Sequence, residues 1–401
     1  MSLVRALLLE TLHPQATEIL TSAGIAVDNR VGALDEDELI EALKGVQLLG
    51  IRSKTQVTER VLAAATDLIA IGAFSIGTNQ VDLGAAARRG VAVFNAPFSN
   101  TRSVVEMALS EMISLTRRLP EHNRQMHAGV WSKSATGAHE IRSRTLGIVG
   151  YGNIGSQLSV IAEALGMNVI FFDNAEKLSL GNATKMPSLD ALLAAADIVT
   201  LHVDGRAGNS GFFGRDQFSI MKPGALFLNL SRGFIVDIEA LKDGLESGHI
   251  GGAAIDVYPV EPKAKGDAFE SPLQDMPNVI LTPHIGGSTE EAQRDIGIFV
   301  ATRLRDYVFH GSTSLSVNLP TLSLEQPQGS HRVVHLHENV PGVLAAVNRQ
   351  FAEYGVNIEA QLLATRGEMG YVVTDVSDGM PADAADALSS MQATVRLRVL
   401  S

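Results

Sequence analysis

The stretch LGIVGYGNIG, residues 146–155, decides the fold of the chain around it. It opens with an apolar strand pattern, and the helix pattern SQLSVIAEALG follows at 156–166. Between them stand Gly150, Gly152 and Gly155, in the spacing of a dinucleotide-binding turn. The first glycine allows a tight turn, the second lets backbone N–H groups approach a pyrophosphate, and the third lets helix and strand pack closely.

A second strand pattern, MNVIFFD at 167–173, ends on an acidic residue. Asp173 can accept hydrogen bonds from both hydroxyls of a ribose, and its charge would repel a 2′-phosphate. The N-terminus of the intervening helix favours the charge of a phosphate. The sequence therefore predicts a Rossmann-type unit that binds NAD in preference to NADP.

Strand and helix patterns alternate on both sides of this turn. Residues 3–95 form one alternating series, and a second series runs from TLGIVG at 145 to NVILTPHIG at 286. Alternation of this kind predicts parallel α/β sheets. Two longer helix patterns lie at about 101–119 and 288–310, and we expect the second to open at Ser288.

The last 70 residues follow a different order. Strand, helix, two strands, helix and strand succeed one another, which is typical of a small ferredoxin-like domain. The segment LPTLSLEQPQGS, residues 319–330, contains prolines and Gly329 and is the best linker candidate.

Composition excludes several classes of protein. The chain has 401 residues, of which 45% are hydrophobic and 19% charged, so we expect a globular protein of two or three domains. No apolar run is long enough to cross a bilayer. The absence of cysteine excludes disulfides and thiolate metal sites, and it favours a cytoplasmic location. A net charge of −12 argues against nucleic acid as a general partner. No metal site is predicted.

Three further strand patterns end on an ionisable residue. ALFLNLSRG carries Arg232, GGAAIDVYPVEP carries Glu261 and NVILTPHIGG carries His284. The carboxyl ends of parallel strands line the ligand crevice of a doubly wound sheet, so these side chains should converge beside the cofactor. Each of them alone would be read as a surface or structural residue, but the ordered set indicates a site.

The three residue types form one chemical set. Removing hydride from a secondary alcohol requires a base for the hydroxyl proton, and histidine titrates in the right range. A nearby carboxylate orients the imidazole and raises its pKa. Arginine offers a planar fork to a substrate carboxylate. We therefore expect Arg232 to hold the carboxylate, His284 to exchange the proton and Glu261 to tune His284.

With the signatures GIVGYGNIG, MKPGALFLNLSRGFIVD, AIDVYPVEP and TPHIGGST, the chain resembles the D-2-hydroxyacid dehydrogenase family. Longer segments, among them VFNAPFSNTRSVVE and HLHENVPGVLAAVNRQFAEYG, are similar to a bacterial branch with a C-terminal regulatory ACT domain. The resemblance implies that NAD oxidises 3-phospho-D-glycerate to 3-phosphohydroxypyruvate, the first step of phosphorylated serine synthesis. It also implies inhibition by L-serine and a homotetramer.

The resemblance further implies a flavodoxin-like substrate domain that is discontinuous in sequence, with the NAD-binding domain inserted in it. The implied parts are a first substrate segment at 1–98, an NAD-binding domain at 99–285, a return helix and linker at 286–328, and an ACT domain at 329–401. Related proteins tend to carry paired glycines at the hinge before the ACT domain, whereas QGSHRV here has only Gly329.

Functional positions of the family carry over onto matching residues of this chain. Besides the three catalytic residues, the implied substrate contacts are Arg52, Ser53, Lys54, Asn100 and Lys133. The implied cofactor contacts are Gly150, Gly152, Asn153, Ile154, Gly155, Asp173, His202, Leu230, Ser231, Asp256 and Gly286. The RSK triplet suits a second anion site, because a phosphorylated acid needs two, although a solvated strand end would look the same. Lys133 lies in VWSKS, a segment similar to one that reaches between subunits in the family.

In the C-terminal segment, the resemblance implies that His337, Asn339 and Asn357 bind L-serine across an interface between two ACT domains. Amide and imidazole groups can hydrogen-bond an amino acid's carboxylate, amine and hydroxyl. Taken without the resemblance, the same residues would be read as helix caps and turn residues.

Two alternatives remain open from the sequence. The same fold and chemistry could act on another 2-oxo or 2-hydroxy acid, such as glyoxylate. The chain could also be an NAD-sensing binding protein, as in corepressors of this family. The RSK triplet argues against the first alternative, and the absence of a basic surface argues against the second.

Overall fold

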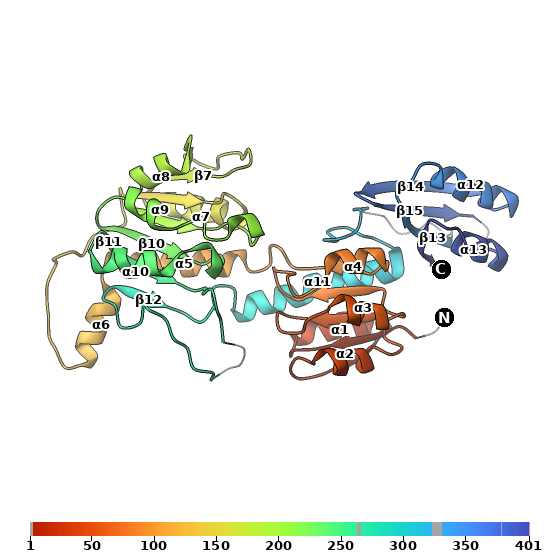
Figure 1. Ribbon diagram of the computed structural model, residues 1–401, viewed down its shortest axis with the longest axis horizontal. Helices are drawn as coiled ribbons and strands as arrows, with labels where there is room; N and C mark the ends of the chain where they lie inside the picture. Colours follow the sequence, from red (N-terminus) through yellow and green to blue (C-terminus); the bar gives the residue numbers. More distant parts are fainter. Residues whose placement is uncertain (1–2, 263–265, 323–330, 378, 401) are drawn as a thin grey trace. The chain divides into compact units, whose positions relative to one another are not determined.

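The structure is a computed structural model that describes residues 3–262, 266–322, 331–377 and 379–400. The chain divides into two compact units. One unit is Asn100–Ala292, and the other combines Met1–Ser99 with Gln293–Ser401. Within the described ranges, the first unit contains one β-sheet and the second contains two (Figure 1).

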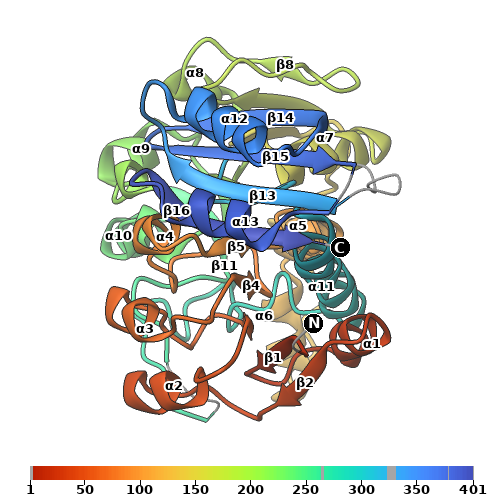
Figure 2. The same cartoon turned by 90° about the vertical axis from the view of Figure 1, so that its right-hand side faces the viewer.

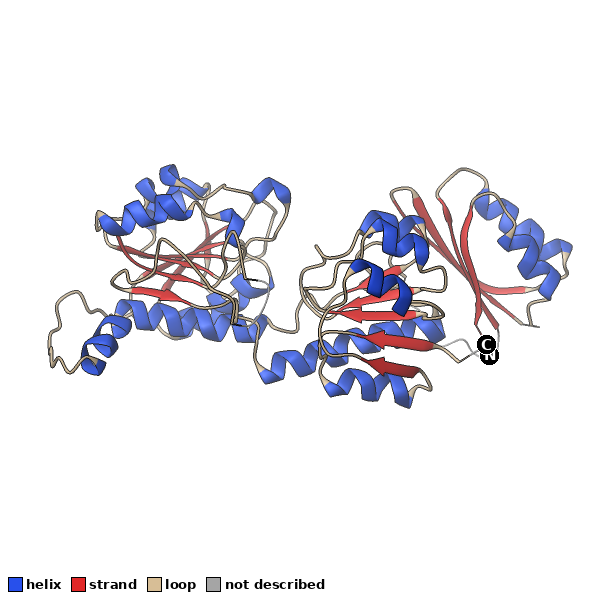
Figure 3. Cartoon of the chain, turned by 60° about the horizontal axis from the view of Figure 1, so that its bottom comes forward, coloured by secondary structure: helices blue, strands red, loops and turns tan. Residues whose placement is uncertain are grey.

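The unit Asn100–Ala292 is a single parallel sheet with helices on both faces (Figure 3). Its strands are β6 (Thr145–Val149), β7 (Asn168–Phe172), β8 (Thr184–Lys185), β9 (Ile198–Leu201), β10 (Ala225–Asn229), β11 (Ile250–Ile255) and β12 (Val279–Leu281). Its helices are α5 (Thr101–Thr116), α6 (Leu119–His127), α7 (Asn153–Ala164), α8 (Leu189–Ala195), α9 (Arg215–Ile220) and α10 (Ile238–Glu246), with short 3₁₀ turns η1 (Ala207–Asn209) and η2 (Gly233–Ile235).

The strand order in this sheet is β12-β11-β10-β9-β6-β7-β8. Apolar side chains from α5 and α7 fill one face, and those from α8, α9 and α10 fill the other. Strands buried on both faces explain the near-continuous apolar runs of the sequence. The chain reverses its direction of winding between β6 and β9, and the carboxyl ends of strands at such a switch point form the ligand crevice of doubly wound sheets.

The second unit contains another parallel sheet, of five strands. These strands are β1 (Arg5–Leu8), β2 (Ala26–Asn29), β3 (Leu48–Ile51), β4 (Ala70–Ala73) and β5 (Ala92–Phe94), in the order β2-β1-β3-β4-β5. The helices are α1 (Pro14–Ser22), α2 (Glu36–Ala42), α3 (Glu59–Ala64), α4 (Leu83–Arg88) and, from far along the chain, α11 (Glu290–His310). Helices α1 and α11 pack on one face and α2, α3 and α4 on the other. The order is that of flavodoxin-like sheets.

Helix α11 approaches this sheet closely at a glycine. A Cβ on Gly72 of β4 would lie 2.6 Å from Cγ1 of Val300, so the helix could not pack at this depth against any other residue. Residues near 72 and 300 therefore share one core, and the substrate-type sheet is completed by a segment that follows the inserted unit. This agrees with the discontinuous substrate domain that the family resemblance implied.

The C-terminal part of the second unit is a four-stranded antiparallel sheet. Its elements are β13 (His331–Glu338), α12 (Val343–Glu353), β14 (Ile358–Arg366), β15 (Met369–Val376), α13 (Ala382–Ser389) and β16 (Thr394–Leu400). The strand order is β14-β15-β13-β16, and α12 and α13 lie on one face (Figure 2). The predicted ferredoxin-like order of elements is confirmed.

Several local expectations differ from the structure. The helix expected over 101–119 ends at Thr116, because Arg118 adopts a left-handed φ of 54° before α6 begins. Helix α11 begins at Glu290, and the hydroxyl of Thr289, not of Ser288, accepts the N–H of Ala292. The linker candidate 319–330 lies outside the described residues from 323 onward, and Gly329 with it. None of the described helices is both long and apolar enough to cross a membrane.

Candidate active site

The glycine turn has the geometry that its sequence predicted. Gly150 has a φ of 94°, and a Cβ on it would lie 2.6 Å from the carbonyl oxygen of His202. A Cβ on Gly155 would lie 2.3 Å from the carbonyl oxygen of Gly150, so only glycine lets α7 start this close to the turn. Around Gly152, in contrast, no atom beyond its own stretch of backbone lies within 4 Å of the Cβ position. This open side is where a pyrophosphate would meet the backbone and the N-terminus of α7, which includes Asn153 and Ile154.

Asp173, directly after β7, faces this turn. Its Oδ2 accepts the backbone N–H of Tyr151 at 2.8 Å, and its Oδ1 accepts that of Ala175 at 2.8 Å. The carboxylate is therefore held beside the glycine turn, where it can receive the hydroxyls of a ribose. The turn and this carboxylate together fit a dinucleotide.

His202 follows β9 and lies against the same turn. Its Nε2 is 3.0 Å from the hydroxyl oxygen of Thr200, whereas Nδ1 is buried and has no hydrogen-bond partner among the described residues. Burial lowers the pKa of His202 to about 4, so the imidazole is neutral at physiological pH. A neutral ring with one orphaned nitrogen suits a polar contact with a bound ligand.

A buried amide organises the turn after β10. The side-chain oxygen of Asn229 accepts both the N–H and the hydroxyl of Ser231, at 3.1 and 2.8 Å, and its Nδ2 donates to the carbonyl of Arg232 at 3.1 Å. The guanidinium of Arg232 in turn donates to the carbonyl of Ser231 at 2.6 Å. Leu230 is buried beside them. Sequence reasoning missed Asn229, although its place as the last residue of β10 could have suggested it.

The predicted catalytic histidine and glutamate are in direct contact. Nδ1 of His284 lies 3.0 Å from Oε1 and 2.9 Å from Oε2 of Glu261. The backbone N–H of Tyr258 donates to Oε1 of Glu261 at 3.3 Å, which orients the carboxylate. Both side chains are half-exposed, so Nε2 of the imidazole can meet a substrate.

The charge of Arg232 interacts with those of Glu261 and His284. The hydrogen bond that His284 donates to Glu261 raises the pKa of His284 above its ordinary value, against the opposing effect of burial. Burial disfavours the charge of Glu261, but the hydrogen bond to His284 and the charges of His284 and Arg232 hold the pKa of Glu261 below its ordinary value. Burial also lowers the pKa of Arg232, while the charge of Glu261 opposes that change. The three residues therefore lie within electrostatic reach of one another.

A second carboxylate holds the loop that carries His284. Asp256 accepts the N–H groups of Ile285 and Gly286, both at 2.8 Å, and the hydroxyl of Thr282 at 2.7 Å. His284 itself has a left-handed φ of 55°, which costs a non-glycine residue about 1–3 kcal/mol. The hydrogen bonds to Asp256 offset this strain and fix the direction of the imidazole.

Two further residues approach this loop. Asn100 precedes α5, and a Cβ on Gly287 would lie 2.1 Å from its Nδ2, so the amide lies against the loop. Its Oδ1 is buried without a partner among the described residues and can accept a hydrogen bond from a ligand. Glu111 of α5 is buried near Asp256, and burial with the charge of Asp256 raises the pKa of Glu111 to about 8. No sequence pattern had pointed to Glu111.

The predicted substrate triplet Arg52-Ser53-Lys54 belongs to the other unit. The carboxylate of Glu10 accepts the backbone N–H groups of Arg52, Lys54 and Thr55, at 3.2, 3.1 and 2.9 Å. Gln80 donates to the carbonyl of Arg52 from the other side. The triplet is thus a shaped loop after β3 rather than a loose strand end, and Glu10 is a residue that sequence reasoning missed.

Lys133 stands apart from these groups. It lies on an exposed segment between α6 and β6 that has no helix or strand, next to Trp131, whose exposure is 79%. Among the described residues Lys133 makes no hydrogen bond or ion pair.

In the antiparallel sheet, His337 is buried with its ring against Gly370. A Cβ on Gly370 would lie 2.2 Å from Cε1 of that ring. Nδ1 of His337 is 2.8 Å from the carbonyl oxygen of Glu338, and Nε2 is buried without a partner in the described ranges. Asn339 donates to the carbonyl of Gly367 at 3.0 Å, which closes the turn between β14 and β15.

Asn357 lies at the opposite end of this sheet. His337 pairs with Gly370 on β15, whereas the residue after Asn357, Ile358, pairs with Val376. Six residues along a strand span roughly 20 Å. One domain therefore does not bring Asn357 to His337 and Asn339.

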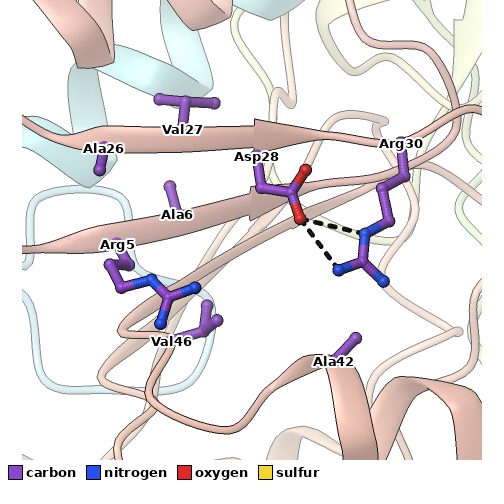
Figure 4. A pocket seen from close by; sticks show the side chains of 8 residues that line it. All are labelled: Arg5, Ala6, Ala26, Val27, Asp28, Arg30, Ala42 and Val46. Atoms are coloured by element: carbon purple, nitrogen blue, oxygen red, sulfur yellow. Dashed lines mark hydrogen bonds and ion pairs between the residues drawn. The ribbon is translucent and has the colours of Figure 1, made fainter.

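A small groove of about 170 Å³ lies elsewhere, beside β1, β2 and α2 (Figure 4). Arg30 and Asp28 form an ion pair of 2.9 Å at its wall, and Arg5 is exposed on the other side. None of the predicted site residues lines this groove.

The pair of His284 and Glu261, together with the glycine turn, fits a hydroxyacid dehydrogenase, and comparisons with known proteins identify the family. Residues 109–286 match the family model "D-isomer specific 2-hydroxyacid dehydrogenase, NAD binding domain", and residues 333–396 match an "AHAS small subunit-like ACT domain". The solved structure of D-2-hydroxyisocaproate dehydrogenase aligns with a TM-score of 0.71 at 26% identity, over 79% of this chain and 100% of that one.

Two curated relatives match over nearly their whole length. D-3-phosphoglycerate dehydrogenase of Escherichia coli (strain K12) is 50% identical over 400 residues, which are 99% of this chain and 97% of the relative. The Haemophilus influenzae protein of the same name is 49% identical, over 100% and 98%. The chain belongs to the D-3-phosphoglycerate dehydrogenase family, within the D-isomer specific 2-hydroxyacid dehydrogenases. The predicted family, fold class and NAD-binding domain are confirmed.

Proposed function

We propose that this chain oxidises 3-phospho-D-glycerate to 3-phosphohydroxypyruvate with NAD, as the first step of phosphorylated L-serine synthesis in the cytoplasm. The observation that carries the proposal is the His284–Glu261 pair at the carboxyl edge of a sheet whose glycine turn fits a dinucleotide. The names of the relatives supply the substrate. We also propose the domain boundaries stated from the sequence, at 98, 285 and 328.

The residues divide the chemistry between them. Arg232 holds the substrate carboxylate in its planar fork. Nε2 of His284 accepts the hydroxyl proton as the C2–H bond breaks, and Nδ1–H remains hydrogen-bonded to Glu261, which stabilises the imidazolium. NAD, when bound, supplies the acceptor for the hydride. Asn100, whose amide lies against the loop that carries His284, is the further substrate contact on this side.

The phosphate end requires a separate cationic site. Arg52 and Lys54 supply the charge, and Glu10 shapes their loop by accepting three backbone N–H groups, which leaves the side chains of Arg52, Ser53 and Lys54 for the ligand. We therefore propose this loop as the contact for the phosphate end of the substrate. Lys133, on its exposed segment, would contribute to a site of a second subunit.

The regulatory proposal rests on the C-terminal sheet. His337 and Asn339 lie at one end and Asn357 at the other, so one L-serine molecule can contact all three residues only if a second copy of the chain supplies Asn357. This supports binding of L-serine between two ACT domains and a homotetramer built from such pairs. Nε2 of His337, buried without a partner in the described ranges, would bind the effector.

The test is NADH formation from 3-phosphoglycerate, with and without L-serine, measured against D-glycerate as a control that lacks the phosphate. Turnover restricted to the phosphorylated acid and suppressed by L-serine would support the whole proposal. Equal turnover of both acids would contradict the proposal that the loop Arg52-Ser53-Lys54 binds the phosphate. Turnover that L-serine leaves unchanged would keep the reaction and reject the effector. Light scattering measures the oligomer independently.

A further inference from the structure

The loop after β9 contains an ion pair whose two members are two residues apart. Nε and Nη2 of Arg206 donate to Oδ2 of Asp204 at 2.7 and 2.6 Å. Oδ1 of the same carboxylate accepts the N–H of Arg206 at 3.3 Å and Nδ2 of Asn209 at 3.0 Å. Asp204 is thus bound by four donors, all from its own loop.

This loop lies against the guanidinium of Arg232. A Cβ on Gly205, the residue between Asp204 and Arg206, would lie 3.3 Å from Nε of Arg232. The charges of Asp204 and Arg232 act on each other: that of Arg232 contributes to holding the pKa of Asp204 below its ordinary value, after the larger effect of the hydrogen bond from Arg206. A carboxylate therefore stands within electrostatic reach of the arginine assigned to the substrate.

Two carboxylates would compete for one guanidinium if Asp204 were free to turn. The planar fork of an arginine pairs with a carboxylate through two parallel hydrogen bonds, and a second carboxylate must displace the first to use that face. Asp204 is half-exposed, so turning would cost little desolvation. A bound Asp204 would mimic the carboxylate end of the substrate.

We propose that Arg206 is a positioning residue that holds Asp204 away from Arg232 and so keeps Arg232 available to the substrate carboxylate. The proposal rests on the proposed function, in which Arg232 binds that carboxylate. It makes Arg206 important for substrate affinity without any contact between Arg206 and the substrate.

The expected signature is a change in KM for the acid alone. Arg206→Ala should raise KM for 3-phosphoglycerate about five- to tenfold, because an intramolecular carboxylate then competes for Arg232. kcat should stay within about twofold, because the substrate has already displaced Asp204 in the saturated complex. KM for NAD should not change.

A double variant separates this role from a merely structural one. In an Asp204→Asn background no charged competitor remains, so adding Arg206→Ala should change KM by less than about twofold. Arg206→Lys, which keeps the cation, should recover part of the lost affinity. Arg215→Ala is the matched control, because Arg215 forms an exposed 2.6 Å ion pair with Asp243 on α9 and α10. That variant should behave as wild type.

Calorimetric binding of 3-phosphoglycerate to the NADH-loaded protein gives the same comparison without turnover, so failure of the proposed reaction and failure of this inference can be told apart. The inference is overturned if Arg206→Ala leaves acid binding unchanged, or if its effect persists in the Asp204→Asn background. It is equally overturned if the variant instead raises KM for NAD, because Arg206 would then serve the cofactor.

Discussion

His284 and Glu261 share a two-point hydrogen bond, in which Nδ1 of the imidazole lies 3.0 and 2.9 Å from the two carboxylate oxygens. An ionised carboxylate only accepts, so Nδ1 carries a proton, and in the proposed reaction Nε2 is the nitrogen that would exchange a proton with the substrate. The left-handed backbone of His284 and the hydrogen bonds of its loop to Asp256 fix the ring in this direction.

Replacing the imidazole should remove the base. We expect His284→Ala to lower kcat about 10²–10⁴-fold, the usual contribution of a general acid or base. NADH binding, followed by fluorescence titration, should stay unchanged because the glycine turn is untouched. His249→Ala is a control at a histidine whose ring Nε2 lies 3.0 Å from the carbonyl oxygen of Phe218. Near-normal turnover in His284→Ala would refute the acid/base role.

Removing the charge of Glu261 should shift the pH profile. Alcohol oxidation needs His284 in its neutral form, and Glu261 raises the pKa of His284. The wild-type rate should therefore rise as the pH increases through that raised pKa. In Glu261→Gln the pKa falls, and the acidic limb of kcat/KM should move to lower pH. The value of kcat/KM on the high-pH plateau should also fall, because the imidazolium that forms during the reaction loses its carboxylate partner. A limb that stays in place or moves to higher pH would contradict this assignment.

The cofactor preference should depend on Asp173. The carboxylate of Asp173 accepts hydrogen bonds from the backbone N–H groups of Tyr151 and Ala175. In Asp173→Asn the side-chain amide oxygen can still accept one of these two hydrogen bonds, so the turn should keep its conformation. Without the charge, a 2′-phosphate is no longer repelled, and the ratio of kcat/KM for NADP to that for NAD should rise about tenfold or more. Asp190→Asn, at an exposed position of α8, is the control. An unchanged ratio would rule out this role.

Glu10 should support the substrate loop. Glu10→Gln places a donor group among three backbone N–H donors, so we expect a loss of about 1–3 kcal/mol in the free energy of unfolding in urea. KM for 3-phosphoglycerate should rise while KM for NAD does not. Glu18→Gln, on an exposed face of α1, is the comparison. If stability and KM are unaffected, the loop does not depend on Glu10.

The effector response should depend on the space above Gly370. Gly370→Ala places a Cβ 2.2 Å from Cε1 of His337, so the imidazole must move. The L-serine concentration for half-inhibition should rise about tenfold or more, since a hydrogen bond to a buried group is lost. Basal turnover without L-serine serves as the internal control. A normal response would exclude His337 from the effector site.

Much of this protein could be predicted from local sequence. The glycine turn could be predicted from the spacing of Gly150, Gly152 and Gly155. A positive φ or a close approach of two backbone segments requires glycine at a single position, and that residue can be read directly from the sequence. The parallel sheets followed from alternating apolar runs. The edge strand β2 is only partly buried, so no continuous apolar run marks it in the sequence.

The tertiary structure decided how the site residues are held. Glu10 meets the loop at 52–55 more than forty residues away, and Asp256 meets Gly286 thirty residues away. Asp204 and Arg206 are close in sequence, but their relation to Arg232 exists only through packing of the loop. The reaction requires particular residue types at the strand ends, so these residues could be predicted from short stretches of sequence. Which buried donor meets which acceptor depends on the path of the whole chain, and no local pattern contains that path.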